Sequence, residues 1–517
     1  MTHSVQKKHI AIIFVIILLL SFFAYSNTFN GEFQFDDDIS VVGNPYVNGA
    51  SKYSLHNLLS GIASGDRPFT AITFALNYRF GGLDVRWYHI TNFLIHIFNG
   101  ILVFYLALFT FNSPKLPGSY HSRAPYAALI AAALFLLHPI QTEAVSYISQ
   151  RYESLASLFY LCSLLAYIKA RLTPSLTLSA TRYTLYAVSI ISGIFAIYSK
   201  EIAITLPVVI ILYDFYFLED KPFLQRLVGP GIFMGLALIA GTLIIFGFGK
   251  SVDAGFSVRA FTPWEYLLTQ FRVIAEYIRL LFLPISQNLD YDFRISRTIF
   301  EVDTFLASAF LAALLTSALI LFKRWRLGSF FILWFFILLS PTSSIVPIID
   351  VIFEHRVYLA SMGFFVIASD LLSRMLISKK IPYKKIAIFF AAIGMILLAA
   401  VTFQRNKVWE TKLSLWEDAA RKSPMKSRVH NNLGNCYMLL GKYFSAIEEY
   451  KKAIALDKNN IEAYYNLGTN LYNVGLLEQA VEYYEIFYNI APASYDKQRL
   501  IVRKRIDSFY SEKRRKE

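Results

Sequence analysis

Three consecutive aspartates, Asp36 to Asp38, follow closely after the first apolar run, in the stretch EFQFDDDISVVGN. A carboxylate at such a place can act as a general base that takes the proton of an attacking hydroxyl. Arginine and lysine side chains held nearby could neutralise a departing phosphate. Because aspartates are also common in turns, where they satisfy backbone amides, this acid–base interpretation requires cationic partners elsewhere in the chain.

Polar side chains recur beside later apolar runs, where an ionisable group is costly, about 2.5–3.5 kcal/mol at the centre of a membrane helix. The candidates for binding a phosphate are Arg356, Arg151 and Lys200. The supporting polar residues are Asn44, His89, Asn92, His138, Glu143, Glu153, Glu201, Glu354 and Tyr358. Plainer roles stay open, such as an interfacial anchor for Arg151, a side chain that reaches towards water for Lys200, or interior hydrogen bonding for His89.

The apolar runs that must position these residues identify a membrane protein. Of the 517 residues, 56% are hydrophobic and 17% are charged, and the mean hydropathy is +0.45. This composition excludes an ordinary soluble enzyme, and repeated runs of about 20 apolar residues indicate membrane-spanning helices. The two cysteines, Cys162 and Cys436, provide neither a disulfide framework nor the spacing of metal ligands.

Clusters of lysine and arginine between the apolar runs mark the cytoplasmic side of the membrane. We expect eleven spans, which place these clusters on one side: 9–26, 87–110, 125–139, 154–170, 184–199, 202–218, 227–248, 304–322, 328–345, 356–375 and 386–403. We expect the first to stay uncleaved, because no convincing small-residue cleavage site follows it. The segment 27–86 and everything after Phe403 are then extracytoplasmic, and the candidate polar residues gather at one outward-facing site.

The segment 265–284, EYLLTQFRVIAEYIRLLFLP, is apolar enough to be mistaken for a further span. Its charged residues Glu265, Arg272, Glu276 and Arg279 fall on one stripe of a helix. This pattern is typical of a helix that lies on the membrane surface. A twelfth span here would also move the basic KRWR sequence to the outside, so we expect an interfacial helix.

The C-terminal part is more polar and contains a repeat. Two similar stretches begin at Asn432 and Asn466, 34 residues apart, and pair Gly434 with Gly468. That period, with small and aromatic residues at fixed places, is the signature of tetratricopeptide repeats. We expect a transmembrane domain at 1–405 and an extracytoplasmic repeat domain at 406–517. The latter comprises a half-repeat at 412–426, repeats near 427–460 and 461–494, and a basic C-terminal tail; a short structural cap is the plainer alternative.

The order of several motifs resembles one known family. FDDD, HITNFLIH, FLLHPIQTEAVSYISQRYES, SKEIAIT and FEHRVYLASMGF, followed by the repeats, are similar to the transmembrane and TPR-containing O-mannosyltransferases. These are C-type glycosyltransferases, so the resemblance implies an all-α polytopic fold and a polyprenyl-phosphate-linked sugar donor. It also implies transfer of a mannose-like sugar to a hydroxyl, such as a serine or threonine of an extracytoplasmic protein.

The resemblance extends to individual positions. The family's paired catalytic aspartates match Asp36 and Asp37, either of which could be the base, whereas Asp38 falls on a variable position. The family's RAD sequence is RYE at Arg151 to Glu153, its KE is Lys200 and Glu201, and its ERVLY is matched by Glu354 to Tyr358 with one residue altered. The resemblance implies no cofactor and no metal; a divalent cation held by the aspartates is an alternative that we do not favour.

Two other functions stay open. The chain could be a C-type transferase that modifies a glycan or a lipid, or a non-enzymatic membrane scaffold or transporter, although paired inverted repeats, typical of transporters, are not evident. The expected partners are the lipid bilayer, the lipid-linked sugar and an acceptor protein or glycan engaged by the repeats, and no nucleic acid. We expect a bacterial inner membrane with the repeats in the periplasm or outside, or the endoplasmic reticulum lumen in a eukaryotic host.

Overall fold

The protein is all-α, as the sequence predicted. The computed structural model describes residues 3–48, 67–173, 179–218, 235, 254–377 and 384–516. Within these ranges the only β pairing is one bridge between Ala254 and Ile348. The chain divides into two compact units, Met1–Gln287 with Arg294–Trp409, and Asn288–Phe293 with Glu410–Glu517.

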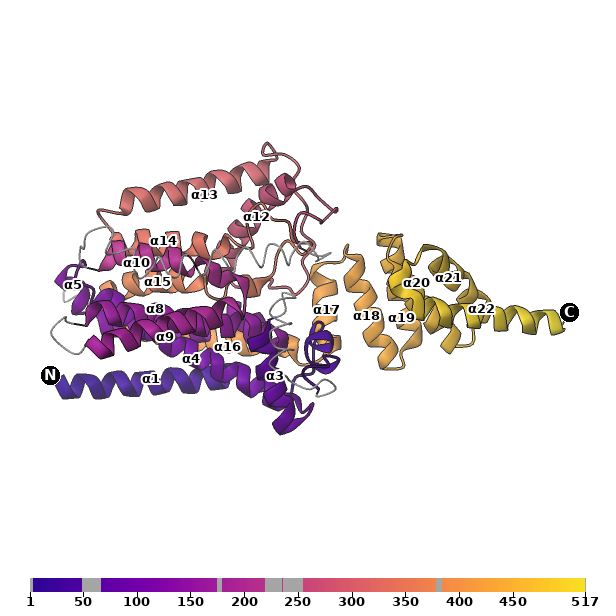
Figure 1. Cartoon of the computed structure of the whole chain (residues 1–517), viewed down its shortest axis with the longest axis horizontal. Coiled ribbons are helices and arrows are strands. Elements are labelled where there is room, and N and C mark those ends of the chain that lie inside the picture. The colour runs from indigo at the N-terminus through magenta and orange to yellow at the C-terminus, as the bar shows by residue number, and fades with distance from the viewer. Residues whose placement is uncertain are drawn as a thin grey trace. The chain divides into compact units, whose positions relative to one another are not determined.

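Unit 1 is built around long apolar helices that run alongside one another (Figure 1). They are α1 (His3–Tyr25), α4 (Val85–Phe111), α6 (Ala124–Leu137), α8 (Arg151–Leu172), α9 (Ser179–Ile197), α10 (Leu206–Phe217), α13 (Val302–Leu321), α14 (Arg326–Leu339), α15 (Ser361–Ile377) and α16 (Lys384–Asn406). Helix α4 packs against α6 and α8, α8 packs against α9, and α1 packs against α16. Their side chains are apolar on most faces, as expected of helices in a lipid environment.

The described helices overlap ten of the eleven expected spans, and the span 227–248 lies outside the described residues except for Gly235. By length and composition, 6 described helices could cross a membrane, or up to 7 if α6 and the segment Pro139–Ser146, bent by 53°, form one span. Helix α14 is apolar but shorter. Several apolar helices therefore fit a membrane protein, and the number eleven stays a prediction.

Two helices begin later than the sequence predicted. Helix α10 is preceded by the 3-10 turn η5 (Glu201–Thr205), and α15 by the 3-10 turn η6 (Glu354–Val357). In η6 the backbone N–H of Glu354 donates to Glu143 at 2.9 Å, a contact from a distant part of the chain. Such long-range hydrogen bonds stabilise a turn where hydropathy alone favours a helix.

Further short elements lie at the end of unit 1 that carries η5 and η6. They are η1 (Ser26–Thr28), η2 (Asp38–Val42), α3 (Pro68–Gly81), η3 (Pro139–Gln141), α7 (Thr142–Ser146), η4 (Ile148–Gln150) and η7 (Lys407–Trp409). Among the candidate polar residues, Asp38 lies in η2, Glu143 in α7, Glu201 in η5, and Glu354 and Arg356 in η6. Helix α5 (Gly118–His121) is a separate short connection between α4 and α6. The gathering of irregular, polar backbone at one end of an apolar bundle is what a site at a membrane surface requires.

The segment expected to be interfacial forms helix α12 (Pro263–Phe282). It starts with a capping box in which Thr262 and Glu265 bond each other's backbone N–H. Tyr266 and Tyr277 are buried on one face, whereas the charged stripe is partly exposed. Helix α12 is not among the helices apolar enough to span a membrane, and its interfacial position stays a prediction.

Unit 2 is a stack of paired helices that confirms the predicted repeats. Its helices are α17 (Lys412–Lys422), α18 (Ser427–Leu439), α19 (Tyr443–Leu456), α20 (Ile461–Asn473), α21 (Leu477–Ile490) and α22 (Asp496–Lys516), with η8 (Ala493–Tyr495) before the last. A Cβ at Gly434 would lie 2.6 Å from the ring of Tyr450, and one at Gly468 would lie 2.7 Å from the ring of Tyr484. Glycine is therefore required where each aromatic ring covers the neighbouring helix.

Unit 2 also includes residues that the sequence did not assign to it. The segment Asn288–Phe293 packs with the repeats. Asp290 is buried and pairs with Lys426 and, at 2.8 Å, with Arg428. The basic C-terminal tail forms helix α22, whose Val502 is part of the same apolar core. These pairings could not be inferred from a 34-residue period, because they join segments outside it.

Candidate functional site

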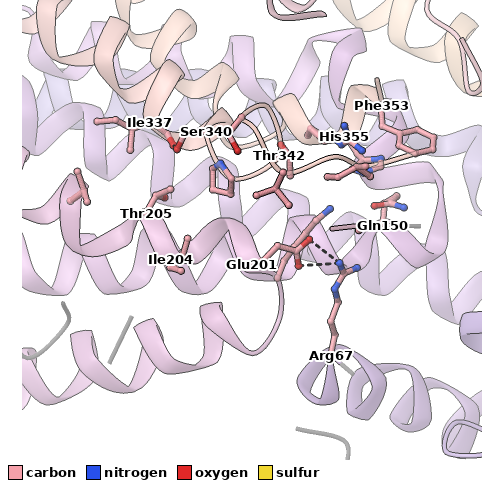
Figure 2. A pocket seen from close by; sticks show the side chains of 18 residues that line it. Arg67, Gln150, Glu201, Ile204, Thr205, Ile337, Ser340, Thr342, Phe353 and His355 are labelled. Atoms are coloured by element: carbon pink, nitrogen blue, oxygen red, sulfur yellow. Dashed lines mark hydrogen bonds and ion pairs between the residues drawn. The ribbon is translucent and has the colours of Figure 1, made fainter. Parts of the chain in front are cut away.

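Unit 1 contains a cavity of ≈ 740 Å³ at the end of the bundle that carries η5 and η6 (Figure 2). Its charged lining residues, with Gln150, come from segments far apart in the sequence: Arg67, Gln150, Lys200, Glu201, His355 and Arg356. The hydroxyl residues Thr205, Ser340, Thr342 and Ser344 also line the cavity. Much of the remaining lining is apolar and includes Ile204, Val208 and Ile337. A cavity that joins three cationic side chains to an apolar wall is suited to a ligand with an anionic head and an apolar tail.

Each cationic residue is placed by the end of a helix. Arg67 immediately precedes α3, where Pro68 occupies the first turn. Lys200 lies in the turn between α9 and α10, and Arg356 lies in η6 before α15. Because these helix ends meet at one place, side chains that are more than a hundred residues apart line the same cavity.

Two of the cations have acidic partners. Arg67 donates to both carboxylate oxygens of Glu201 at 3.0 Å, the contact drawn in Figure 2. Lys200 pairs with Glu153 at 2.7 Å, and both side chains are buried. Burial opposes ionisation of Glu201, but the charges of Arg67 and Lys200 outweigh it and lower the pKa of its carboxyl.

Arg356 is held differently. Its guanidinium donates to the backbone oxygens of Val351 at 3.1 Å and Asp350 at 2.7 Å, and it lies over the ring of Phe353. Carbonyl oxygens orient a guanidinium without cancelling its charge. Two carbonyl contacts therefore hold Arg356, and the negative charges of Asp350 and Glu143 also act on its guanidinium.

His355 lies beside these cations and is fixed from two sides. Its Nδ1 is 2.7 Å from a carboxylate oxygen of Glu143, and its ring stacks on Phe353 with centroids 5.1 Å apart. The other oxygen of Glu143 accepts from the backbone N–H of Glu354. Burial, together with the charges of Lys200, Arg356 and Arg67, holds the pKa of His355 well below its ordinary value.

The three aspartates differ in their surroundings. Asp37 is buried and accepts hydrogen bonds from the backbone N–H groups of Gln34 at 2.8 Å and Ser149 at 2.6 Å. Burial raises the pKa of Asp37 to about 7, although these two hydrogen bonds oppose the shift. Asp36 is partly exposed and Asp38 is exposed. Asp37 therefore ties the segment 34–38 (the aspartate loop) to Ser149, which precedes Gln150 of the cavity wall.

The backbone of the aspartate loop is held by an aromatic pair as well. The N–H of Asp36 donates to the hydroxyl of Tyr147 at 2.8 Å, and Tyr147 stacks on Trp409. Among the described residues, the lining of the cavity does not include Asp36 or Asp37. The loop is thus a rigid neighbour of the cavity wall, and Asp36 is the more accessible of its two candidate bases.

Arg151, a predicted phosphate ligand, lies in a buried network instead. Its guanidinium donates to Asn92 at 2.6 Å, to Thr73 at 3.1 Å and to the carbonyl of Tyr88 at 3.0 Å, and it lies over the ring of Phe74. Arg151 is not among the residues that line the cavity. Its contacts join α3, α4 and α8, so its evident role is to fix the helices around the site.

The remaining supporting residues hold loops. His89 bonds the carbonyl of Gly31 at 3.2 Å, and His138 bonds the carbonyl of Leu281 at 3.2 Å. Tyr358 contacts His96 and Asn99 inside the bundle, and Asn44 bonds the backbone of its own turn. None of the four supporting residues His89, His138, Tyr358 and Asn44 is among the described residues that line the cavity.

Sequence reasoning assigned roles to Lys200, Glu201 and Arg356 but none to Arg67, Gln150 or His355, although Gln150 and His355 lie within motifs that carry the family resemblance. Arg67 stands before a proline that starts a helix, which is a weak signal. Its bond to Glu201 spans 134 residues, so no local pattern could have shown it.

Metal binding was not expected from the sequence. Within the described ranges, no group of three or more His, Cys, Asp or Glu side chains is arranged to hold a metal ion. A chain of this kind can still recruit a cation together with its substrate, so metal independence stays a prediction.

Comparisons with known proteins match both the membrane unit and the repeats. Family models described as "TPR repeat" and "Tetratricopeptide repeat" match residues 434–475 and 461–494. A protein O-mannosyl-transferase of Caenorhabditis elegans is 26% identical over 478 residues, which cover 86% of this chain and 62% of the relative. The protein O-mannosyl-transferase TMTC1 of Homo sapiens is 25% identical, with 86% of this chain and 55% of the relative covered.

A third relative, the protein O-mannosyl-transferase Tmtc3 of Drosophila melanogaster, is 23% identical and matches 81% of this chain and 51% of its own length. The chain thus spans about half to three fifths of the length of these relatives. The matches extend over the membrane unit as well as the repeats, as the motif order predicted. The chain is therefore a homologue of the TMTC-like protein O-mannosyl-transferases and carries tetratricopeptide repeats.

Proposed function

We propose that this protein is an integral-membrane glycosyltransferase that moves a mannose-like sugar from a polyprenyl-phosphate donor to a serine or threonine hydroxyl of an extracytoplasmic protein. The observation that carries the proposal is the cavity in which Arg67, Lys200 and Arg356 meet beside an apolar wall. The names of the relatives support mannose as the sugar and protein as the acceptor.

The three cations of the cavity, Arg67, Lys200 and Arg356, can stabilise the leaving group. In the reaction the acceptor oxygen forms a bond to the anomeric carbon while the bond from that carbon to the phosphate oxygen breaks. Negative charge grows on the phosphate, which leaves as polyprenyl phosphate. Arg356, held by backbone carbonyls, is placed to stabilise this charge, with Lys200 and Arg67 beside it.

A carboxylate must take up the proton of the acceptor hydroxyl. We assign this role to Asp36, because it is partly exposed, whereas both oxygens of Asp37 accept backbone hydrogen bonds in a buried position. Asp37 then positions the loop that carries the base. In this division of roles the hydroxyl proton moves to Asp36 as the new glycosidic bond forms.

The apolar wall supports a lipid-linked donor rather than a nucleotide sugar. Ile204 of η5, Val208 of α10 and Ile337 of α14 line the cavity. The side chain of Val208 is 46% exposed, so this wall is open to a ligand. An isoprenoid chain next to a phosphate would contact such a surface and leave its remaining length in the bilayer.

The location of the activity follows from the donor. We place the cavity and the repeats on the extracytoplasmic side, in the periplasm of a bacterial inner membrane or in the endoplasmic reticulum lumen of a eukaryotic host. The repeats would present the acceptor protein, since stacked helix pairs form extended surfaces for partners.

The test uses purified protein in proteoliposomes with a polyprenyl-phosphate mannose that is radiolabelled in the sugar. We expect the label to move to a protein acceptor, bound through serine or threonine. Label in a glycan or a lipid would instead show the related C-type activity. Label that stays on the donor with every class of acceptor would contradict a transferase and favour a membrane scaffold.

A further inference from the structure

His355 has a fixed orientation that the proposed reaction does not use. A carboxyl oxygen of Glu143 lies 2.7 Å from Nδ1, so a hydrogen bond joins the two groups. The same carboxylate is tied to the backbone N–H of Glu354, and Phe353 stacks on the ring, so the imidazole cannot easily rotate. The ring is fixed with Nε2 as its remaining nitrogen.

Nε2 is directed to a ligand rather than to the protein. His355 lines the cavity, as Figure 2 shows, and among the described residues no hydrogen-bond partner occupies Nε2. Nε2 of a neutral imidazole can form one hydrogen bond, as acceptor or as donor. A hydroxyl group of a ligand suits this position, because it can both donate and accept.

The neighbouring charges decide whether His355 acts as a base or as a neutral hydrogen-bonding group. Arg67, Lys200 and Arg356 line the same cavity, so a second proton on the imidazole would add a fourth positive charge to the group. The resulting fall in the pKa of His355 makes it a poor proton acceptor. Nε2 is nevertheless available for a hydrogen bond with a neutral hydroxyl.

We propose that His355 is a specificity residue for the transferred sugar: its Nε2 forms a hydrogen bond with one hydroxyl of the sugar whose phosphate lies against Arg67, Lys200 and Arg356. The inference rests on the proposed function, because it places a sugar phosphate in this cavity. It adds that the protein senses the sugar itself, through a neutral imidazole that Glu143 holds in one orientation.

The test compares two lipids on the full chain in nanodiscs: undecaprenyl-phosphate mannose and undecaprenyl phosphate without a sugar. His355→Phe keeps a ring that can stack on Phe353 but removes both nitrogens. We expect the variant to bind the mannosyl lipid roughly five- to tenfold more weakly, the effect of one neutral hydrogen bond, and to bind undecaprenyl phosphate as the wild type does.

A matched control is Ser340→Ala, which removes a hydroxyl from the same cavity wall that already bonds the carbonyl of Ile337. It should leave the ratio of the two affinities unchanged. An unchanged ratio in His355→Phe, or an equal loss for both lipids, would overturn the sugar contact. Wild-type protein that binds neither lipid would instead overturn the proposed donor site itself.

A second measurement needs no variant, should His355→Phe fail to fold. Monodeoxy mannosyl lipids, each lacking one hydroxyl, are bound to the wild-type protein. We expect one of them to bind roughly five- to tenfold more weakly, because its missing hydroxyl is the hydrogen-bond partner of Nε2. Equal binding of the whole monodeoxy series would overturn the proposal.

Discussion

At the scale of single residues, the site separates groups that face the cavity from groups that hold its walls. Lys200 and Arg356 face the cavity, whereas Arg151 is committed to Asn92, Thr73 and Tyr88. All three are cations near an apolar run, so composition could not tell them apart. The difference arises from which helix faces meet, and this is a property of tertiary packing.

The aspartates give the first prediction. Asp36→Asn keeps the shape of the side chain but removes the base, so turnover should fall by roughly 10²–10⁴-fold with donor binding largely intact. Asp38→Asn is the matched control, because Asp38 is exposed and should tolerate the change. Turnover measured with a labelled donor checks both, and near wild-type turnover in Asp36→Asn would remove Asp36 from the reaction.

Asp37→Asn should act differently. An amide can accept only through its oxygen, so one of the two backbone N–H groups, of Gln34 or Ser149, would lose its partner. We expect a loss of stability of roughly 1–3 kcal/mol, measured as a lower thermal midpoint. A midpoint equal to that of the wild type would show that the clamp is not required for the fold.

The phosphate site gives the next prediction. Arg356→Ala should weaken donor binding by roughly 1.5–3 kcal/mol, the contribution of a charge-assisted hydrogen bond. Arg259→Ala is a suitable control, because Arg259 is exposed and does not line the cavity. Titration of the purified variants with undecaprenyl phosphate would decide; wild-type affinity in Arg356→Ala would move the main contact to Arg67 or Lys200.

At the scale of elements, hydropathy predicted where helices lie better than where they begin. The apolar runs are local signals, and the described helices overlap ten of the expected spans. The turns η5 and η6 were missed because distant partners stabilise them, such as Glu143 for the N–H of Glu354. Those turns carry Glu201, His355 and Arg356. The long-range contacts that make the starts of α10 and α15 hard to predict therefore also form the site.

The repeats were predictable because their glycines and aromatic residues are paired by period. Gly468→Ala would place a Cβ 2.7 Å from the ring of Tyr484, and overpacking of this kind typically costs about 1–3 kcal/mol. We expect unit 2 of the full chain to become more sensitive to limited proteolysis. Asn473→Ala on the same helix is exposed and should not change the cleavage rate; equal rates for both variants would contradict the packing.

At the scale of the whole molecule, the orientation in the membrane is testable by fusion. A reporter that is active only outside the cytoplasm should be active after Phe403 or at Gly49, and silent at Arg326 and Lys380. The reason is the positive charge of the loops assigned to the cytoplasm. Activity at Arg326 would mean that the segment 265–284 crosses the membrane and that the count of eleven is wrong.

The central claim is that the cavity of unit 1 holds the phosphate of a polyprenyl-linked sugar. The most direct measurement is a cryo-electron microscopy structure of the full chain in nanodiscs with undecaprenyl phosphate. We predict density for the phosphate in hydrogen-bond contact with Arg356 and with Lys200 or Arg67, and density for the isoprenoid chain along Val208 and Ile337. A phosphate bound elsewhere on the protein, with this cavity empty, would contradict the account.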